Sequence, residues 1–122
     1  MFQTEFEFTL PKGYLDGEGN LHRKGVMRLA KAMDEIVPLK DPRVQSNPAY
    51  ATVLILSRVV VRLGVLESIS PRVIENLFAA DLNHLYDLYR QINDLEPLPP
   101  ENGQVITPGS NQALPTPPGD SP

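Results

Sequence analysis

"LDGEGNLHRKGVMRLA", residues 15–30, places two glycines in a polar segment, followed by a basic run and a short apolar end. This stretch suits a phosphate-binding loop, a nucleic-acid contact, or the turn and second strand of a β-hairpin. A phosphate loop requires a glycine-rich turn that leads directly into a helix N-terminus. Here the glycines lead into "HRKG", which starts a helix poorly, and their spacing matches neither a Walker motif nor a dinucleotide fingerprint. The stretch therefore favours a hairpin.

The segment before the turn supports this interpretation, because its residues alternate with the period of two that is typical of a half-buried strand. One face holds Phe2, Thr4, Phe6, Phe8 and Leu10, and the other holds Gln3, Glu5, Glu7 and Thr9. Pro11 and Gly13 are expected to end this first strand. The sequence "DGEGN" at residues 16–20 is rich in turn formers and predicts the tip.

A second strand is expected over about residues 21–30. Leu21, Met27 and Leu29 would share its apolar face, and Gly25 would mark a bulge. A basic run then faces solvent opposite the acidic residues of the first strand, where opposite charges favour pairing. The members of this run are Arg23, Lys24, Arg28 and Lys31.

The rest of the chain predicts helices. Asn47 suits an N-cap, Pro48 a first helical position and Gly64 a position just beyond the helix end, so we expect a helix over residues 48–63. Its many β-branched residues make a strand the competing interpretation, and the length of the run favours the helix. Residues 71–93 carry an amphipathic stripe and form either one helix or two. Residues 31–47 are expected to form a connector with at most a helical turn near Asp34.

Composition limits the kinds of partner and of domain organisation that the chain can have. The chain has 122 residues, no cysteine and a net charge of −4, which disfavours nucleic acid as the main partner. Its start lacks the basic region of a secretory signal, and its longest apolar stretch is too short and too charged to span a bilayer. Residues 95–122 hold eight of the thirteen prolines and no lysine or arginine. We therefore expect an α+β domain over residues 1–94, with an N-terminal hairpin and two or three packed helices, followed by a disordered tail over residues 95–122.

No arrangement of residues predicts catalysis. His22 and His84 lack the spacing of a metal site, and Ser57 lacks the flanking glycines of a nucleophile elbow. We therefore expect no catalytic, cofactor or metal site. The helix over residues 48–63 is apolar nearly all round, so a strip of it would stay exposed as a protein interface unless residues 31–47 cover it.

Three stretches, "EFTLPKGYLDGEGNLHRKGVMRLA", "DPRV…NPAY" and "LSRVVVRLG…SPRVIENLFAADLNHLYDLYRQIN", resemble the small phage tail assembly proteins. These are encoded beside tail-tube and baseplate genes in phage-like contractile injection clusters, and the pattern is also similar to wider tail assembly chaperone families. The resemblance covers about residues 4–93. It implies a non-enzymatic, cytoplasmic chaperone or adaptor that binds a tail tube or tape-measure component before assembly.

Such a helper needs an apolar face of its own, and the two long predicted helices offer the most apolar surface. The expected partner-binding residues are Leu82, Leu85, Tyr86, Tyr89, Tyr50 and Leu54. Two alternatives stay open: a structural subunit retained in the contractile particle and, more weakly, a small nucleic-acid-binding regulator that uses the basic run. Formation of a homo-oligomer is also left open.

Overall fold

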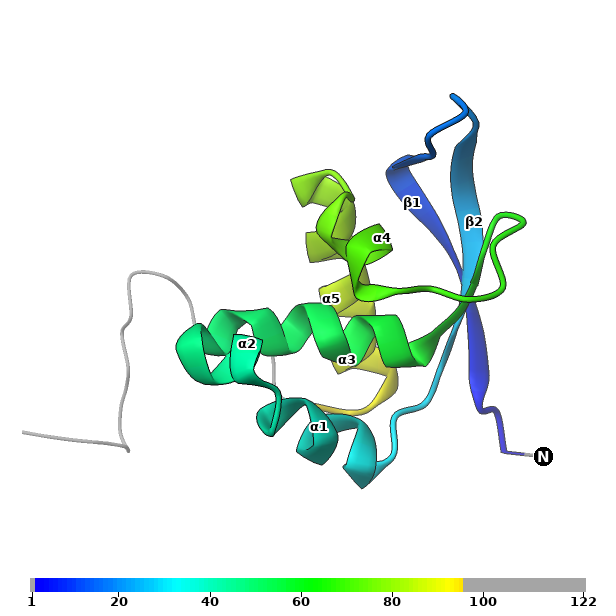
Figure 1. The fold of residues 1–122 in the computed structure, drawn as a ribbon. Coiled ribbons are helices and arrows are strands. Elements are labelled where there is room, and N and C mark those ends of the chain that lie inside the picture. Colours follow the sequence, from blue (N-terminus) through cyan, green and yellow to red (C-terminus); the bar gives the residue numbers. More distant parts are fainter. Residues whose placement is uncertain (1, 96–122) are drawn as a thin grey trace, which may run out of the picture.

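The computed structural model describes residues 2–95, which form an α+β fold with an N-terminal hairpin followed by helices, as predicted. The antiparallel sheet has the order β1-β2-β3, and the helices lie together on one side of it (Figure 1). Its strands are β1 (Glu5–Leu15), β2 (Leu21–Arg28) and β3 (Val60–Leu63). The helices are α1 (Ala32–Leu39), α2 (Pro42–Ser46), the 3₁₀ turn η1 (Pro48–Tyr50), α3 (Ala51–Val59), α4 (Pro71–Glu75) and α5 (Ala79–Ile92). The predicted tail lies outside the described residues, apart from Leu95.

Strand β1 keeps the predicted alternation, with Phe8 and Leu10 buried and Phe6 half-buried. The expectation that Pro11 and Gly13 end the strand is wrong, because β1 continues to Leu15 through a register shift between residues 9 and 14. The shift takes backbone amides out of the ladder, where they need other acceptors. The buried carboxylate of Asp81 in α5 supplies them, accepting from the backbone N–H of Lys12 at 2.8 Å and of Gly13 at 2.9 Å.

Strand β2 differs from its predicted register. Leu21 is exposed, whereas Met27 is buried and His22 occupies the inward position beside the turn. The Phe8 ring packs directly against Gly25. A Cβ at Gly25 would lie 2.5 Å from that ring, so the position leaves no room for a side chain. The register shift of β2 lies between residues 26 and 27, where β2 pairs with β3, rather than at Gly25 itself.

The prediction of a helix over residues 48–63 is wrong for residues 60–63, which form β3. The start at Pro48 is correct, but α3 ends at Val59, and Val60 turns to an extended backbone with φ −81° and ψ 109°. The β-branched run at this point suits a strand, and the free edge of β2 gives it a pairing partner. Gly64 then takes φ +60° and donates its backbone N–H to the Lys24 carbonyl at 2.7 Å.

Residues 71–93 form two helices, α4 and α5, separated where Phe78 adopts an extended backbone. Residues 31–47 are more helical than expected, because they form α1 and α2. Helices α1 and α4 both pack against α3, and within α3 only Arg58 is exposed. The core therefore lies between the sheet, α3 and α5, and its fully buried members include Leu10, Met27, Leu56, Leu63, Ile74 and Leu85.

Candidate functional site

Three of the six predicted partner-binding residues belong to the interior. Leu85, Tyr89 and Leu54 are buried. The amphipathic stripe of residues 71–93 is thus the face that α5 turns toward the core, so Leu85 and Tyr89 cannot meet a partner in this fold. Leu82, Tyr86 and Tyr50 are half-buried.

The tyrosines are engaged within the chain. The Tyr89 hydroxyl donates a hydrogen bond to the Glu35 carboxylate of α1, and burial together with this bond raises the pKa of Tyr89 well above its usual range. Tyr86 stacks on Tyr89, and the Arg90 guanidinium lies 5.6 Å from the centre of the Tyr86 ring.

Tyr50, in η1, is also held by contacts with other side chains of the domain. Its hydroxyl donates to the Glu75 carboxylate of α4, which raises the pKa of the tyrosine, and the Arg43 guanidinium lies 5.1 Å from the centre of its ring. Two of the three predicted tyrosines, Tyr50 and Tyr89, thus link one helix to another.

A buried carboxylate fixes α1 to the rest of the domain. Asp34 accepts two hydrogen bonds from the Arg28 guanidinium of β2, at 2.7 and 2.9 Å, and one from Nε of Arg58 in α3, at 3.0 Å. It also accepts the backbone N–H of Lys31 at 2.8 Å, which caps the helix. The Arg28 guanidinium, with support from Lys31 and Arg58, holds the pKa of Asp34 well below its usual range despite the burial.

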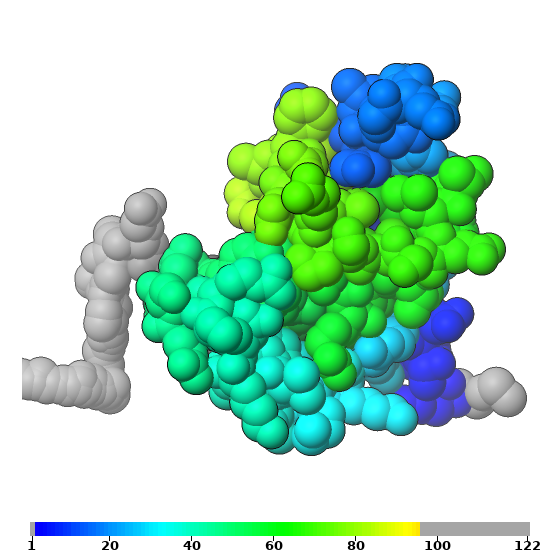
Figure 2. All heavy atoms as spheres, viewed as in Figure 1, coloured from blue at the N-terminus to red at the C-terminus, as the bar shows by residue number. Residues whose placement is uncertain are grey.

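The opposite side of α1 is apolar and faces solvent. Met33 is 52% exposed, Ile36 45% and Leu39 61%. We call these three side chains the outer stripe. Because residues three and four apart share a helix face, the outer stripe runs along one side of α1, while Asp34 and Pro38 share the inner side. The polarity of α1 is therefore partly inverted relative to an ordinary surface helix: Asp34 is buried and three aliphatic residues face solvent, while Glu35 is exposed and Val37 is half-buried. In the space-filling view, α1 occupies the lower surface of the molecule (Figure 2).

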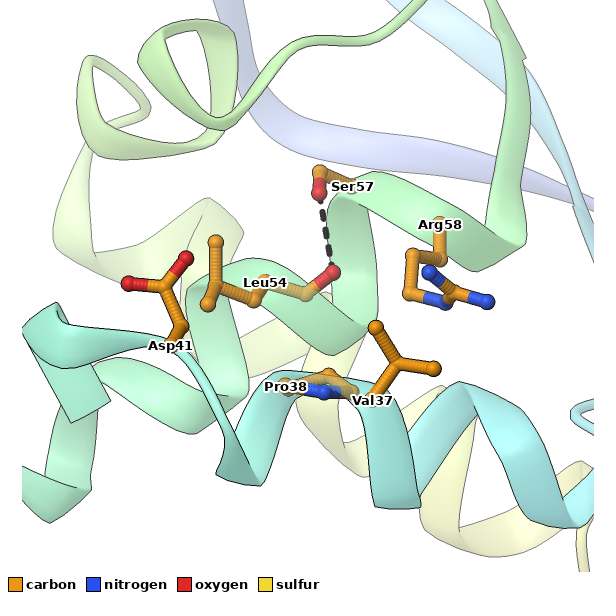
Figure 3. A pocket seen from close by; sticks show the side chains of 6 residues that line it. All are labelled: Val37, Pro38, Asp41, Leu54, Ser57 and Arg58. Carbon is orange, nitrogen blue, oxygen red and sulfur yellow. Dashed lines mark hydrogen bonds between the residues drawn. The ribbon is translucent and has the colours of Figure 1, made fainter. Parts of the chain in front are cut away.

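A small pocket opens between α1 and α3 (Figure 3), with a volume of about 190 Å³. Val37 and Pro38 of α1 and Leu54 of α3 give it apolar walls. Asp41 and Arg58 lie at opposite ends of the pocket in this view. Leu54, one of the predicted site residues, thus contributes to the candidate site as a pocket wall.

The predicted basic run is not a continuous free surface. Arg28 is bound to Asp34, and the Arg23 side chain donates to the backbone carbonyl of Leu10 at 3.0 Å. Lys24 and Lys31 are exposed. Two of the four cations are therefore committed to contacts within the chain.

Neither histidine stands in a metal cluster: within residues 2–95, no three His, Asp or Glu side chains are grouped closely enough to hold a metal ion. His22 is buried against Gly64, stacks on Tyr14 and has its Nε2 2.9 Å from the Asp16 carboxylate. This contact lowers the pKa of Asp16 to about 2, and the same carboxylate accepts the backbone N–H of Glu18 in the turn. The pair therefore organises the hairpin tip.

Sequence reasoning missed the outer stripe. The spacing of Met33, Ile36 and Leu39 was a helical signal within "KAMDEIVPLK", but Pro38 obscured it, because proline inside a helix removes a hydrogen bond. Comparison of the chain with models of protein families, with curated proteins and with solved structures gives no match. None of the helices within residues 2–95 is long and apolar enough to cross a membrane.

Proposed function

We propose that this protein is a non-enzymatic tail assembly chaperone or adaptor, which binds a tube or tape-measure component of a phage-like contractile particle through the outer stripe of α1. The observation that carries the proposal is the partly inverted polarity of α1, with Asp34 buried and three large aliphatic side chains exposed. The motif resemblance over about residues 4–93 supplies the class of partner.

The outer stripe has the chemistry of a binding surface. Single exposed aliphatic residues are common on proteins, whereas a contiguous set on one helix face indicates an interaction site. The network around Asp34 ties α1 to β2 and α3, so the stripe is held in place before a partner arrives. Such preorganisation lowers the entropy lost on binding.

The size of the surface fits a temporary contact. A helix of eight residues is about 12 Å long and about 10 Å wide, so one face of it presents about 120 Å², well below the roughly 800 Å² per partner that a stable interface buries. An interface centred on α1 is therefore small and dissociable. A chaperone needs this property, because it must release its subunit when the tail assembles.

Gradient separation of mature particles from free protein tests this proposal. The chaperone function predicts that the protein co-sediments with free tube or tape-measure subunit and is missing from finished particles. Fixed copy number in purified particles, together with no affinity for either free subunit, would contradict it and favour a retained structural subunit. A salt-dependent shift on DNA would instead favour the nucleic-acid function.

A further inference from the structure

Two lysines stand at the ends of the outer stripe. Lys31 precedes α1 and Lys40 follows it, and both side chains are exposed. Neither forms a salt bridge within residues 2–95. The eight residues of α1 lie between them, so nine helical steps separate them by about 13 Å along the helix axis and by about half a turn around it. The apolar stripe is therefore bracketed by two positive charges. We infer that it binds an amphipathic helix whose apolar face is bracketed by acidic residues at a similar spacing, and this inference rests on the proposed function.

The positive potential around α1 is a local property of the fold. The chain as a whole carries a net charge of −4. At α1, however, the Asp34 carboxylate is neutralised by two guanidinium groups, those of Arg28 and Arg58, and Glu35 is engaged by Tyr89. With the Asp41–Arg43 pair that follows α1 included, three arginines and two lysines stand against three acids, so this side of the molecule keeps an excess of positive charge and attracts acidic partners.

The pocket beside α1 adds a third basic contact at its Arg58 end, while Asp41, at the other end, is paired with Arg43. Only Nε of Arg58 is used by Asp34, and the Arg58 side chain is 38% exposed at one end of the pocket (Figure 3). A guanidinium presents donors in a fork that suits a carboxylate. With a volume of about 190 Å³, the pocket can admit one side chain from a helix lying on α1.

A second copy of this chain fits the stripe poorly. In an antiparallel two-fold pairing of α1 helices, Lys31 of one copy would face Lys40 of the other, and in a parallel pairing each lysine would face itself. Both arrangements bring like charges together, which disfavours association. The geometry therefore points to a different, acidic partner.

Nuclear magnetic resonance of the full chain with labelled methionine methyl groups tests this inference. Met33 reports on the outer stripe, and Met27, buried in β2, is an internal control. The probes are two synthetic amphipathic helices with the same leucine face, one with a glutamate at each end of that face, eleven residues and about three turns apart, and one with lysines at those positions. We expect the acidic peptide to shift the Met33 signal with at least about tenfold higher affinity, because two exposed ion pairs replace two repulsions. Added salt should reduce this difference.

A charge swap gives the matched control. In the variant Lys31→Glu with Lys40→Glu, the preference should reverse toward the basic peptide, while Ile36→Ser should weaken binding of both peptides. Equal affinity for the two peptides, or no binding of either, would overturn the inference. A Met33 signal that changes with protein concentration would assign the stripe to a second copy. A signal altered in the free protein by Glu96→Lys with Glu101→Lys would assign it to the chain's own acidic C-terminal residues.

The two proposals fail separately. Capture of a purified tail subunit without a charge preference among peptides would remove the inference and leave the proposed function standing. If the peptides show the charge preference but neither tail subunit binds, the inference of an acidic helical partner stands and the proposed function fails.

Discussion

Replacing Asp34 by asparagine tests whether the buried network holds α1 in place. The Asp34 side chain is 5% exposed and accepts three hydrogen bonds from guanidinium groups. Removing one partner of a fully buried ion pair costs about 3–5 kcal/mol. The side chains of Arg28 and Arg58 are 31% and 38% exposed, so water can hydrate them and the cost falls to the lower end of that range. We expect a loss of about 3 kcal/mol, which for a domain of this size lowers the melting temperature by about 12–24 °C.

Asp34→Asn should also make the free energy of unfolding less dependent on pH in the acid range. The pKa of Asp34 is lower in the folded chain than in the unfolded chain, chiefly because of the Arg28 guanidinium. The stabilisation is therefore complete above the unfolded pKa of about 4 and is lost as the pH falls toward the folded pKa. Between about pH 4 and 2, the wild-type protein should lose more stability than Asp34→Asn does.

Urea denaturation followed by circular dichroism, repeated across this pH range, measures both effects. Asp41→Asn is the matched control, because Asp41 pairs with Arg43 at the surface of α2 and asparagine remains a good N-cap. Its cost should be clearly smaller than that of Asp34→Asn, because exposed ion pairs contribute little to stability. If Asp34→Asn destabilises the protein no more than Asp41→Asn does, the network does not hold α1 in place.

Further predictions concern the hairpin and its neighbours. Phe8→Ala should lower the free energy of unfolding by about 3–5 kcal/mol, because the Phe8 ring is buried over Gly25. Phe6→Ala should lower it clearly less, because Phe6 is half-buried. Equal losses in urea denaturation would contradict the register of β1. Gly64→Ala should lower the melting temperature strongly, because its φ is +60° and a Cβ would lie 2.2 Å from Nδ1 of His22. Gly17→Ala, where a Cβ meets no atom within 4 Å, should change the melting temperature little, and a similar loss in both variants would contradict this packing.

Local patterns predicted the parts of the fold that local physics determines. The alternation before Leu10 gives the hairpin, and Asn47–Pro48 marks a helix start in both the sequence and the structure. The change from helix to strand at Val60 could not be predicted, because it depends on the edge of β2, a distant segment of the chain. The continuation of β1 past Pro11 depends in the same way on Asp81, which lies almost seventy residues away.

The candidate site was harder to predict, since an amphipathic stripe shows which residues share a face and not which way that face points. Leu85 and Tyr89 share the apolar face of α5, and the fold turns that face inward. In α1 the relation is reversed, because Arg28 and Arg58 draw Asp34 inward and leave Ile36 outside. Only the tertiary position of the two arginines reveals this.

Calorimetric titration of the full chain with purified tube and tape-measure proteins of the proposed particle measures whether the outer stripe of α1 is a binding surface. We expect binding to one of them, and a loss of affinity of about thirtyfold or more in the variant Ile36→Ser with Leu39→Ser, as for anchors worth about 2 kcal/mol or more. Val65→Ser removes a comparably exposed aliphatic side chain outside α1 and should leave the affinity unchanged. Unchanged affinity in the α1 variant, with its fold intact by circular dichroism, would contradict the account.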